Sequence, residues 1–319
     1  MKDLAKISDG KALIAPDTIT ALIKKFLASQ DIKEKSRETY GKALKQFFLY
    51  FKDTELRTLT REHILDYKKS ILEKNKSPYT VSAYITAVRK FFEWTEGLKV
   101  YPNIAKGIKG AKASKDFKKY ALTVEQVKTI LSSIPRSSAI GKRDYALLNL
   151  LVRTGLRTIE VCRANIEDIR QEGGEALLYI QGKGRDTKDA FVLLTDETLK
   201  PINEYLAERK NTQDNSPLFA SLSDRNNSGR LTTRSLSRTV KGHLIKIGLN
   251  SKRFTAHSFR HTAVTLSLLA GASLQETQAL ARHSNINTTM IYAQNIQRIA
   301  GAPERKIDKL LAEEVNSVN

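Results

Sequence analysis

The sequence predicts a mainly α-helical protein of two domains, the second of which also holds a small three-stranded antiparallel sheet. Three observations lead to this prediction. The chain has 319 residues, about twice the length of an ordinary domain. Apolar residues recur every three or four positions over most of the chain, which is typical of helices packed on a core. Only the stretch 165–194 shows short apolar runs separated by glycine-containing turns, as strands do.

The first domain is expected over 17–103, after an N-terminal extension of residues 1–16. Aromatic and aliphatic residues recur at helical spacing in it, so we expect the aromatic side chains to form the core rather than to stack on bases. Ser77-Pro78 suits the N-cap and first position of a helix. The predicted helices cover 17–28, 38–51, 60–73 and 78–101.

A basic linker is expected over 104–120. It contains six lysines and a single acidic residue, Asp116, and its glycines at 107 and 110 should make the backbone flexible. Such a charge run is either a solvated connector or a strap along a phosphate backbone, and the basic domains on both sides favour the strap. The lysines that would contact DNA are Lys106, Lys109, Lys112, Lys115, Lys118 and Lys119.

The second domain is expected over 121–300, followed by a tail of residues 301–319. Its first helix should be capped by Thr123, and a longer apolar helical run over 143–163 is interrupted at Gly155. Strands are predicted at 165–170, 176–181 and 190–194, and further helices at 196–209, 233–247, 256–270, 274–282 and 286–298.

The charge points to a polyanionic partner. Lys and Arg number 54 against 34 Asp and Glu, a net charge of +20, and nucleic acid is the usual partner of so basic a protein. No apolar run approaches the roughly 18 residues of a membrane span, so we expect no membrane contact. The single cysteine, Cys162, excludes an internal disulfide framework and a cysteine-based zinc site, and favours a reducing cytoplasm.

The residues that could carry chemistry are cations and one late tyrosine. The sequence has no phosphate-binding loop of the G-x-x-x-x-G-K type, no H-E-x-x-H and no compact set of carboxylates. Chemistry on a phosphodiester would therefore proceed without a metal or other cofactor. Arginines can hold the nonbridging oxygens, and His257 and Arg260 share one helix face. Neighbouring cations would ease ionisation of Tyr292, whose free pKa is about 10.

On these residues the sequence resembles the tyrosine recombinases, or phage integrase family, which includes the Xer and Cre recombinases. Segment 154–157 with Glu160 resembles the family's first-arginine box, and 182–184 resembles the hairpin that carries its lysine. Segment 256–262 resembles the His-x-x-Arg box. The final histidine and the nucleophile correspond to His283 and Tyr292. The resemblance covers nearly the whole chain, with the boxes in the expected order.

The resemblance implies a role for each of these residues. Tyr292 would attack the scissile phosphate and form a 3′-phosphotyrosyl link. Arg157 and Arg260 would hold its nonbridging oxygens, and Lys183 would protonate the leaving 5′-oxygen. His257 would act as a general base or as an orienting group. His283 would hydrogen-bond the phosphate, and Glu160 would orient Arg157 or a neighbouring histidine.

The resemblance also implies an architecture and partners. The first domain would be a helical, SAM-like core-binding domain, and the second a catalytic domain. The protein would act on paired sites in double-stranded DNA as a homotetramer, through a Holliday junction, with its tail swapped into a neighbour and with or without accessory proteins. Integration or excision of a mobile element and Xer-type resolution both stay open. The alternatives are a type IB topoisomerase-like enzyme and a catalytically idle DNA-binding protein.

Four neighbouring residues complicate the assignment. Arg185 and Lys188 share the turn of Lys183, so either could be mistaken for the catalytic lysine, and Arg185 is also a candidate DNA contact. His261 is expected to be structural. Arg282 precedes His283 where relatives commonly have glycine, which places a bulky charge beside the site.

Overall fold

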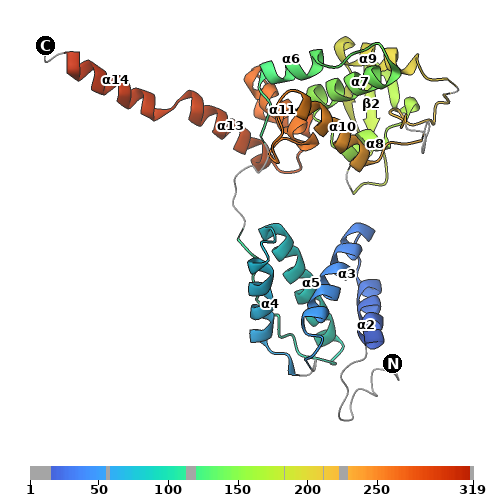
Figure 1. Cartoon of the computed structure of the whole chain (residues 1–319), viewed down its shortest axis with the longest axis vertical. Coiled ribbons are helices and arrows are strands. Elements are labelled where there is room, and N and C mark those ends of the chain that lie inside the picture. Colours follow the sequence, from blue (N-terminus) through green and yellow to red (C-terminus); the bar gives the residue numbers. More distant parts are fainter. Residues whose placement is uncertain are drawn as a thin grey trace. The chain divides into compact units, whose positions relative to one another are not determined.

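The structure is a computed structural model that describes residues 16–54, 58–112, 120–182, 184–210, 212–222 and 229–316, without the side chains of 16–18 and 313–316. The chain divides into two compact units, Met1–Asp116 and Phe117–Asn319, and each is described by itself. Both are mainly helical, and the second contains a small sheet (Figure 1). The predicted fold class is therefore confirmed.

The described part of the N-terminal unit consists of four helices (Figure 1). Their bounds are α2 (Pro16–Ser29), α3 (Glu34–Tyr50), α4 (Arg61–Glu73) and α5 (Pro78–Gly97). Ser77 caps α5 as predicted, because its side chain accepts a hydrogen bond from the backbone N–H of Thr80 at 3.1 Å. The expected fourth helix was too long, since α5 ends at Gly97.

Aromatic side chains form the core of this unit, as predicted. The ring of Phe47 lies edge-to-face against Phe48, Tyr67 and Phe92, at centroid distances of 5.0 to 6.0 Å. Ala105 and Ile108 are buried in the same core. The first part of the expected linker therefore packs on the N-terminal unit, because its small and apolar residues complete that core.

The C-terminal unit is built around one buried helix, α7 (Ala139–Thr154), which packs against α6 (Val124–Ser132), α9 (Asp196–Leu206) and α11 (Ala256–Leu269). Leucines on all sides of α7 are fully buried, which fits its nearly all-apolar sequence. Thr123 caps α6, as expected. The other helices are α8 (Thr158–Arg163), α10 (Thr233–Lys246), α12 (Leu274–Ala281), α13 (Ile286–Ala300) and α14 (Pro303–Asn316).

The described strands form one antiparallel sheet in the order β1 (Ile169–Glu172), β2 (Glu175–Ile180) and β3 (Ala190–Leu193). Leu178 of the middle strand pairs with Ile169 and Val192. The first strand begins four residues later than predicted. Residues 165–168 instead form a short 3₁₀ turn, because the Asp168 carboxylate accepts the Asn165 backbone N–H at 2.7 Å.

The C-terminal helix α14 exposes an apolar face. Ile307, Leu310 and Leu311 are 55 to 60% exposed, and they lie on one side of the helix at i, i+3 and i+4. This helix occupies most of the tail expected over 301–319. None of the helices in the described segments is long and apolar enough to cross a membrane.

Candidate active site

The first arginine is placed by a turn between α7 and α8. Gly155 ends α7 with a φ of 61°, in the left-handed region that favours glycine, and a Cβ there would lie 3.2 Å from the Cβ of Ala263. Two residues later Arg157 caps α8, and its backbone N–H donates to Glu160 at 2.8 Å. The turn and the cap together fix the backbone of Arg157.

Glu160 is buried, and guanidinium groups surround its carboxylate. Its carboxylate accepts Arg157 Nη1 at 2.8 Å and Arg282 Nη2 at 3.2 Å, although only 1% of Glu160 is exposed. Arg260, which is also buried, donates to the carbonyl oxygens of Gly155 (2.6 Å) and Ala281. Among its described residues, this cluster therefore contains three guanidiniums and one carboxylate, so its net charge is positive.

Arg260 is strongly affected by this environment. Burial, followed by the charges of Arg157 and Arg282, lowers its pKa to about 10, and the charge of Glu160 opposes this shift only in part. The side chain still carries its charge at neutral pH. A buried charge that is only partly compensated makes this region attractive to an anion such as a phosphodiester.

Arg157, His257 and Arg260 line one cleft of about 700 Å³. The cleft lies between α8, the start of α11, and α10, which contributes Thr233 and Ser237 to its wall. Hydroxyl groups and cations around such a cleft are the groups that bind phosphate oxygens. The structure thus brings together three of the predicted catalytic residues on an accessible surface.

Tyr292 lies at the edge of this cluster and is buried. It is 7% exposed, and its hydroxyl lies 2.5 Å from Nδ1 of His261. Burial raises the pKa of Tyr292 to about 12, and Arg260 offsets this only in part. Arg260 does ease the ionisation of Tyr292, as expected of a neighbouring cation, but desolvation of the phenolate outweighs that attraction in this conformation.

His261, which the sequence predicts to be structural, contacts the hydroxyl of Tyr292. Burial lowers the pKa of His261 to about 4, so it is neutral at pH 7, and its Nδ1 shares a hydrogen bond with the hydroxyl of Tyr292. Proton transfer from a group of pKa about 12 to one of about 4 is unfavourable by on the order of 10 kcal/mol. His261 therefore holds the tyrosine rather than deprotonating it. Its position on the same helix face as His257, four residues on, was the available signal.

His283 approaches the cluster from the loop between α12 and α13. Its Nδ1 lies 2.9 Å from the hydroxyl of Thr289, which is fully buried, and its ring stacks on Tyr292 at 6.4 Å. Burial, followed by the charges of Arg260 and Arg157, lowers the pKa of His283 to about 4. With Nδ1 held by Thr289, Nε2 is the nitrogen left for a phosphate oxygen.

His257 stands on the exposed first turn of α11 and contacts His261 edge-to-face, with ring centroids 4.7 Å apart. The described hydrogen bond to Tyr292 comes from His261 and not from His257. In this conformation the His261 imidazole contacts both His257, the predicted base, and Tyr292, the predicted nucleophile.

The lysine turn between β2 and β3 is described except at its centre. Lys183 lies outside the described residues. Of its two rivals, Arg185 forms an ion pair with Asp189, and Lys188 donates to both oxygens of buried Asp168 at 2.7 Å. Both rival cations are thus engaged in pairs within the sheet region.

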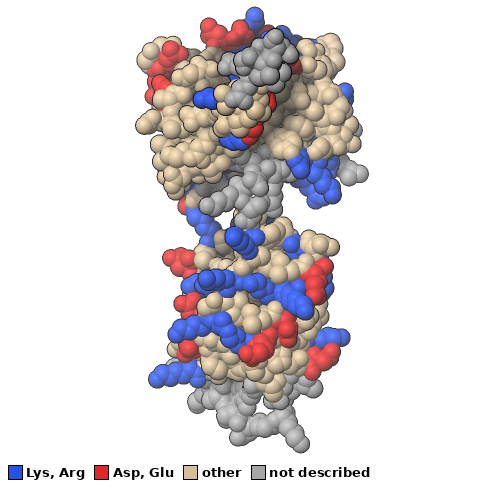
Figure 2. Space-filling model, turned by 90° about the vertical axis from the view of Figure 1, so that its left-hand side faces the viewer, with Lys and Arg blue, Asp and Glu red and all other residues tan. Residues whose placement is uncertain are grey.

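The predicted DNA contacts in the linker are only partly described. Lys106, Lys109 and Lys112 are exposed, and Lys115, Lys118 and Lys119 lie outside the described residues. Figure 2 shows Lys and Arg side chains gathered in bands over one face of the N-terminal unit, with acidic side chains between and beside them. Over the described ranges, no group of three or more His, Cys, Asp or Glu side chains could hold a metal ion.

Comparison with known proteins shows the family of the chain. Residues 121–298 match the phage integrase family, and 20–101 match the SAM-like N-terminal domain of phage integrases. A tyrosine recombinase of Synechocystis sp. is 30% identical over 273 residues, which is 82% of this chain and 86% of that protein. The tyrosine recombinase XerD of Listeria innocua is 29% identical over 285 residues, 85% of this chain and 90% of XerD.

A solved structure has the same fold. The XerH site-specific recombinase bound to palindromic difH substrate, in a post-cleavage complex, aligns with a TM-score of 0.72. It is 22% identical and covers 90% of this chain and 96% of its own. The buried arginine cluster and the late tyrosine on this fold define an enzyme that acts on a phosphodiester through a tyrosine. The chain belongs to the phage integrase family and is a site-specific DNA recombinase of the tyrosine type.

Proposed function

We propose that the chain recombines paired sites in double-stranded DNA in the cytoplasm, in integration or excision of a mobile element or in Xer-type resolution. The observation that carries this proposal is the net positive cluster of Arg157, Glu160 and Arg260 beside Tyr292. A phosphodiester placed there would supply the missing negative charge. The family membership disfavours a topoisomerase-like enzyme and an idle DNA-binding protein.

The proposed reaction is a transesterification. The Tyr292 oxygen forms a bond to the scissile phosphorus, and the bond from phosphorus to the 5′-oxygen breaks. The phenol proton passes to a base, for which His257 is our candidate, and Lys183 protonates the leaving 5′-oxygen. Because the phosphotyrosyl link keeps the energy of the phosphodiester, a second 5′-hydroxyl reverses the step on another strand without ATP or metal.

The remaining residues stabilise the charge of the reacting phosphate. Arg157 and Arg260 hold the nonbridging oxygens, which acquire charge in the transition state, and His283 adds a hydrogen bond through Nε2. Glu160 orients Arg157 through the 2.8 Å ion pair. Tyr292 must first leave His261, so the hydrogen-bonded conformation is a resting state that binding of DNA releases.

DNA would be held by both units. The basic face in Figure 2, the exposed linker lysines and Arg185 offer charge to the phosphate backbone. The XerH structure was solved bound to its difH substrate, which supports a DNA partner for a protein of this fold. Because these contacts are to phosphates, they give affinity rather than sequence recognition.

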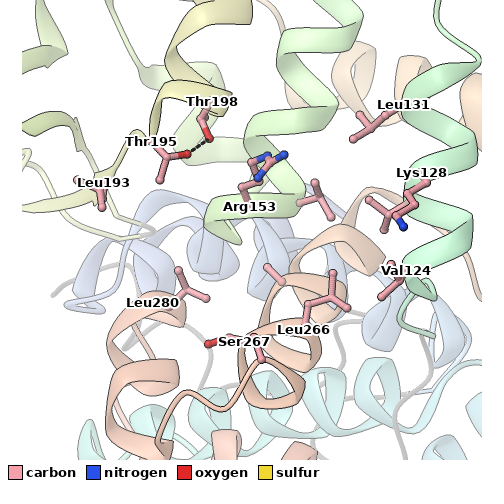
Figure 3. Close-up of a pocket in the computed structure, with 14 residues that line it drawn as sticks. Val124, Lys128, Leu131, Arg153, Leu193, Thr195, Thr198, Leu266, Ser267 and Leu280 are labelled. Atoms are coloured by element: carbon pink, nitrogen blue, oxygen red, sulfur yellow. Dashed lines mark hydrogen bonds between the residues drawn. The ribbon is translucent and has the colours of Figure 1, made fainter.

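We further propose that the protein acts as a homotetramer in which α14 docks on a neighbour. An apolar groove of about 540 Å³ lies between α6, the end of α7 and α11 (Figure 3). Val124, Leu131 and Leu266 line it, a set that matches the exposed leucines of α14. Leu310→Asp should weaken assembly on DNA, measured by mass photometry, while a groove variant, Leu266→Asp, should fail in the same way.

The test of the catalytic proposal is a nicked suicide duplex. Its sequence is first recovered from a pool of random duplexes by binding to the full-length protein. Incubated without metal, the wild-type protein should give a covalent protein–DNA band on a denaturing gel, and Tyr292→Phe should give none while still binding the duplex. Tight binding without a covalent band in the wild type would exclude the proposal.

A further inference from the structure

Arg282 occupies an unusual place beside the phosphate site. It ends α12 with a φ of 52° in the left-handed region, which glycine adopts more readily than arginine does. It directly follows Ala281, whose carbonyl accepts Arg260, and directly precedes His283. Its backbone therefore links two predicted catalytic residues.

The side chain of Arg282 binds the acceptors that hold the two catalytic arginines. Its Nη2 lies 3.2 Å from Glu160, which also binds Arg157, and 3.5 Å from the carbonyl oxygen of Gly155, which also binds Arg260. Its Nη1 donates to the carbonyl oxygen of Leu280 at 2.7 Å. The Arg282 guanidinium thus connects the end of α12 to Glu160, which binds Arg157, and to the Gly155 carbonyl, which binds Arg260.

This arrangement is costly for a purely structural residue. The backbone is strained, the side chain is only 15% exposed, and burial lowers the pKa of Arg282. Its Nε is buried and has no hydrogen-bond partner among the described residues. A glycine at this position would remove all of these costs, and costs of this kind persist where a function requires them.

We propose that Arg282 is a positioning residue of the recombination reaction, which fixes Glu160 and the Gly155 carbonyl and through them the guanidiniums of Arg157 and Arg260. The inference rests on the proposed function of that cluster. Loss of Arg282 leaves both arginines in the protein but frees their anchors. The phosphate charge is then less well stabilised in the transition state, whereas binding of the duplex, spread over many contacts, changes little.

The experiment compares the wild type with Arg282→Gly and Arg282→Lys on the nicked suicide duplex. Each protein is given a scissile phosphate and, separately, a neutral methylphosphonate at the same position. With the phosphate, we expect cleavage by Arg282→Gly to be 10- to 100-fold slower, with Arg282→Lys in between and binding within about 3-fold. With the methylphosphonate, the deficit should shrink at least 5-fold, because less charge then needs stabilising.

Asn75→Gly is the matched control. Asn75 is an exposed residue of the N-terminal unit with a φ of 53°, so the change relieves a similarly strained backbone position without removing a charge. We expect no change in its cleavage rate. Equal rates for Arg282→Gly and the wild type would overturn the inference, as would an equal deficit on both substrates. If the wild type itself forms no covalent complex, the proposed function fails, and this inference with it.

Discussion

Two buried clusters of arginine and carboxylate lie in the C-terminal unit, and they are built differently. In the first, Arg143 donates through Nε and Nη2 to one oxygen of Asp144, at 2.9 and 2.7 Å, and His243 binds the other oxygen at 2.9 Å. In the second, Glu160 is shared by Arg157 and Arg282, and Arg260 relies on backbone carbonyls.

The difference lies in charge balance. In the Arg143–Asp144–His243 cluster one guanidinium meets one carboxylate, so each charge is compensated within the fold and the cluster can join α7 to α10. In the Glu160 cluster the positive charges exceed the negative one, and carbonyl oxygens compensate them only partly. The Arg143 and Asp144 charges balance each other in the first cluster, whereas the second cluster is suited to receive an anion.

The largest expected effect is on cleavage, from Arg260→Gln. This change removes the charge and leaves a shorter side chain that can still donate a hydrogen bond. Cleavage of the suicide duplex should fall about 10³-fold, because a donor aimed at developing charge is lost. Rates of covalent complex formation measure it. A fall of less than 10-fold would show that the excess charge of the Glu160 cluster does not serve the reaction.

The matched change in the balanced cluster is Asp144→Asn, and it should act on stability instead. It leaves the Arg143 guanidinium buried without its carboxylate, which we expect to lower the free energy of unfolding by about 3 kcal/mol. Urea denaturation measures this, and cleavage by the folded variant at low temperature should stay near the wild-type rate. Normal stability with lost cleavage would reverse the assignment of the two clusters.

The sequence indicated which residues belong to the candidate site, but not the contacts that join them. The helix order followed from periodicity, and Arg157, Arg260 and Tyr292 followed from motif spacing. The bond from Arg260 to Gly155 spans 105 positions and Arg282 reaches Glu160 across 122, so no local pattern could indicate them. The buried state of Tyr292 depends on how α13 packs on α11, which a motif does not contain.

Local chemistry also explains the misplaced first strand. Residues 165–170 have the apolar content of a strand, but Asp168 bonds back to Asn165 and pairs with Lys188, which comes 20 positions later. A side-chain acceptor that satisfies the backbone turn, strengthened by a distant cation, outweighed the weak strand propensity.

A smaller effect is expected on the free energy of unfolding at low pH. It tests whether His261, beside Tyr292, is buried and neutral. The pKa of His261 is about 4 when folded and about 6.5 when unfolded, so the unfolded chain takes up a proton first as the pH falls. His261 should therefore cost about 2 kcal/mol of stability between pH 7 and pH 5. Urea denaturation at both pH values should show a correspondingly smaller loss for His261→Gln. An equal loss in both proteins would mean that His261 is not buried and neutral.

The smallest expected effect concerns the tautomer of His283, at the border of the charged cluster. Thr289→Val keeps the shape of a fully buried side chain and removes the hydroxyl that lies 2.9 Å from Nδ1. Nε2 is then no longer fixed as the nitrogen that faces the phosphate, and cleavage should fall roughly 3- to 10-fold, comparable to one neutral hydrogen bond. Thr289→Ser retains the hydroxyl and should cleave within 2-fold of the wild type. If the serine and valine variants cleave at the same rate, the hydroxyl does not orient His283, and packing alone holds the ring.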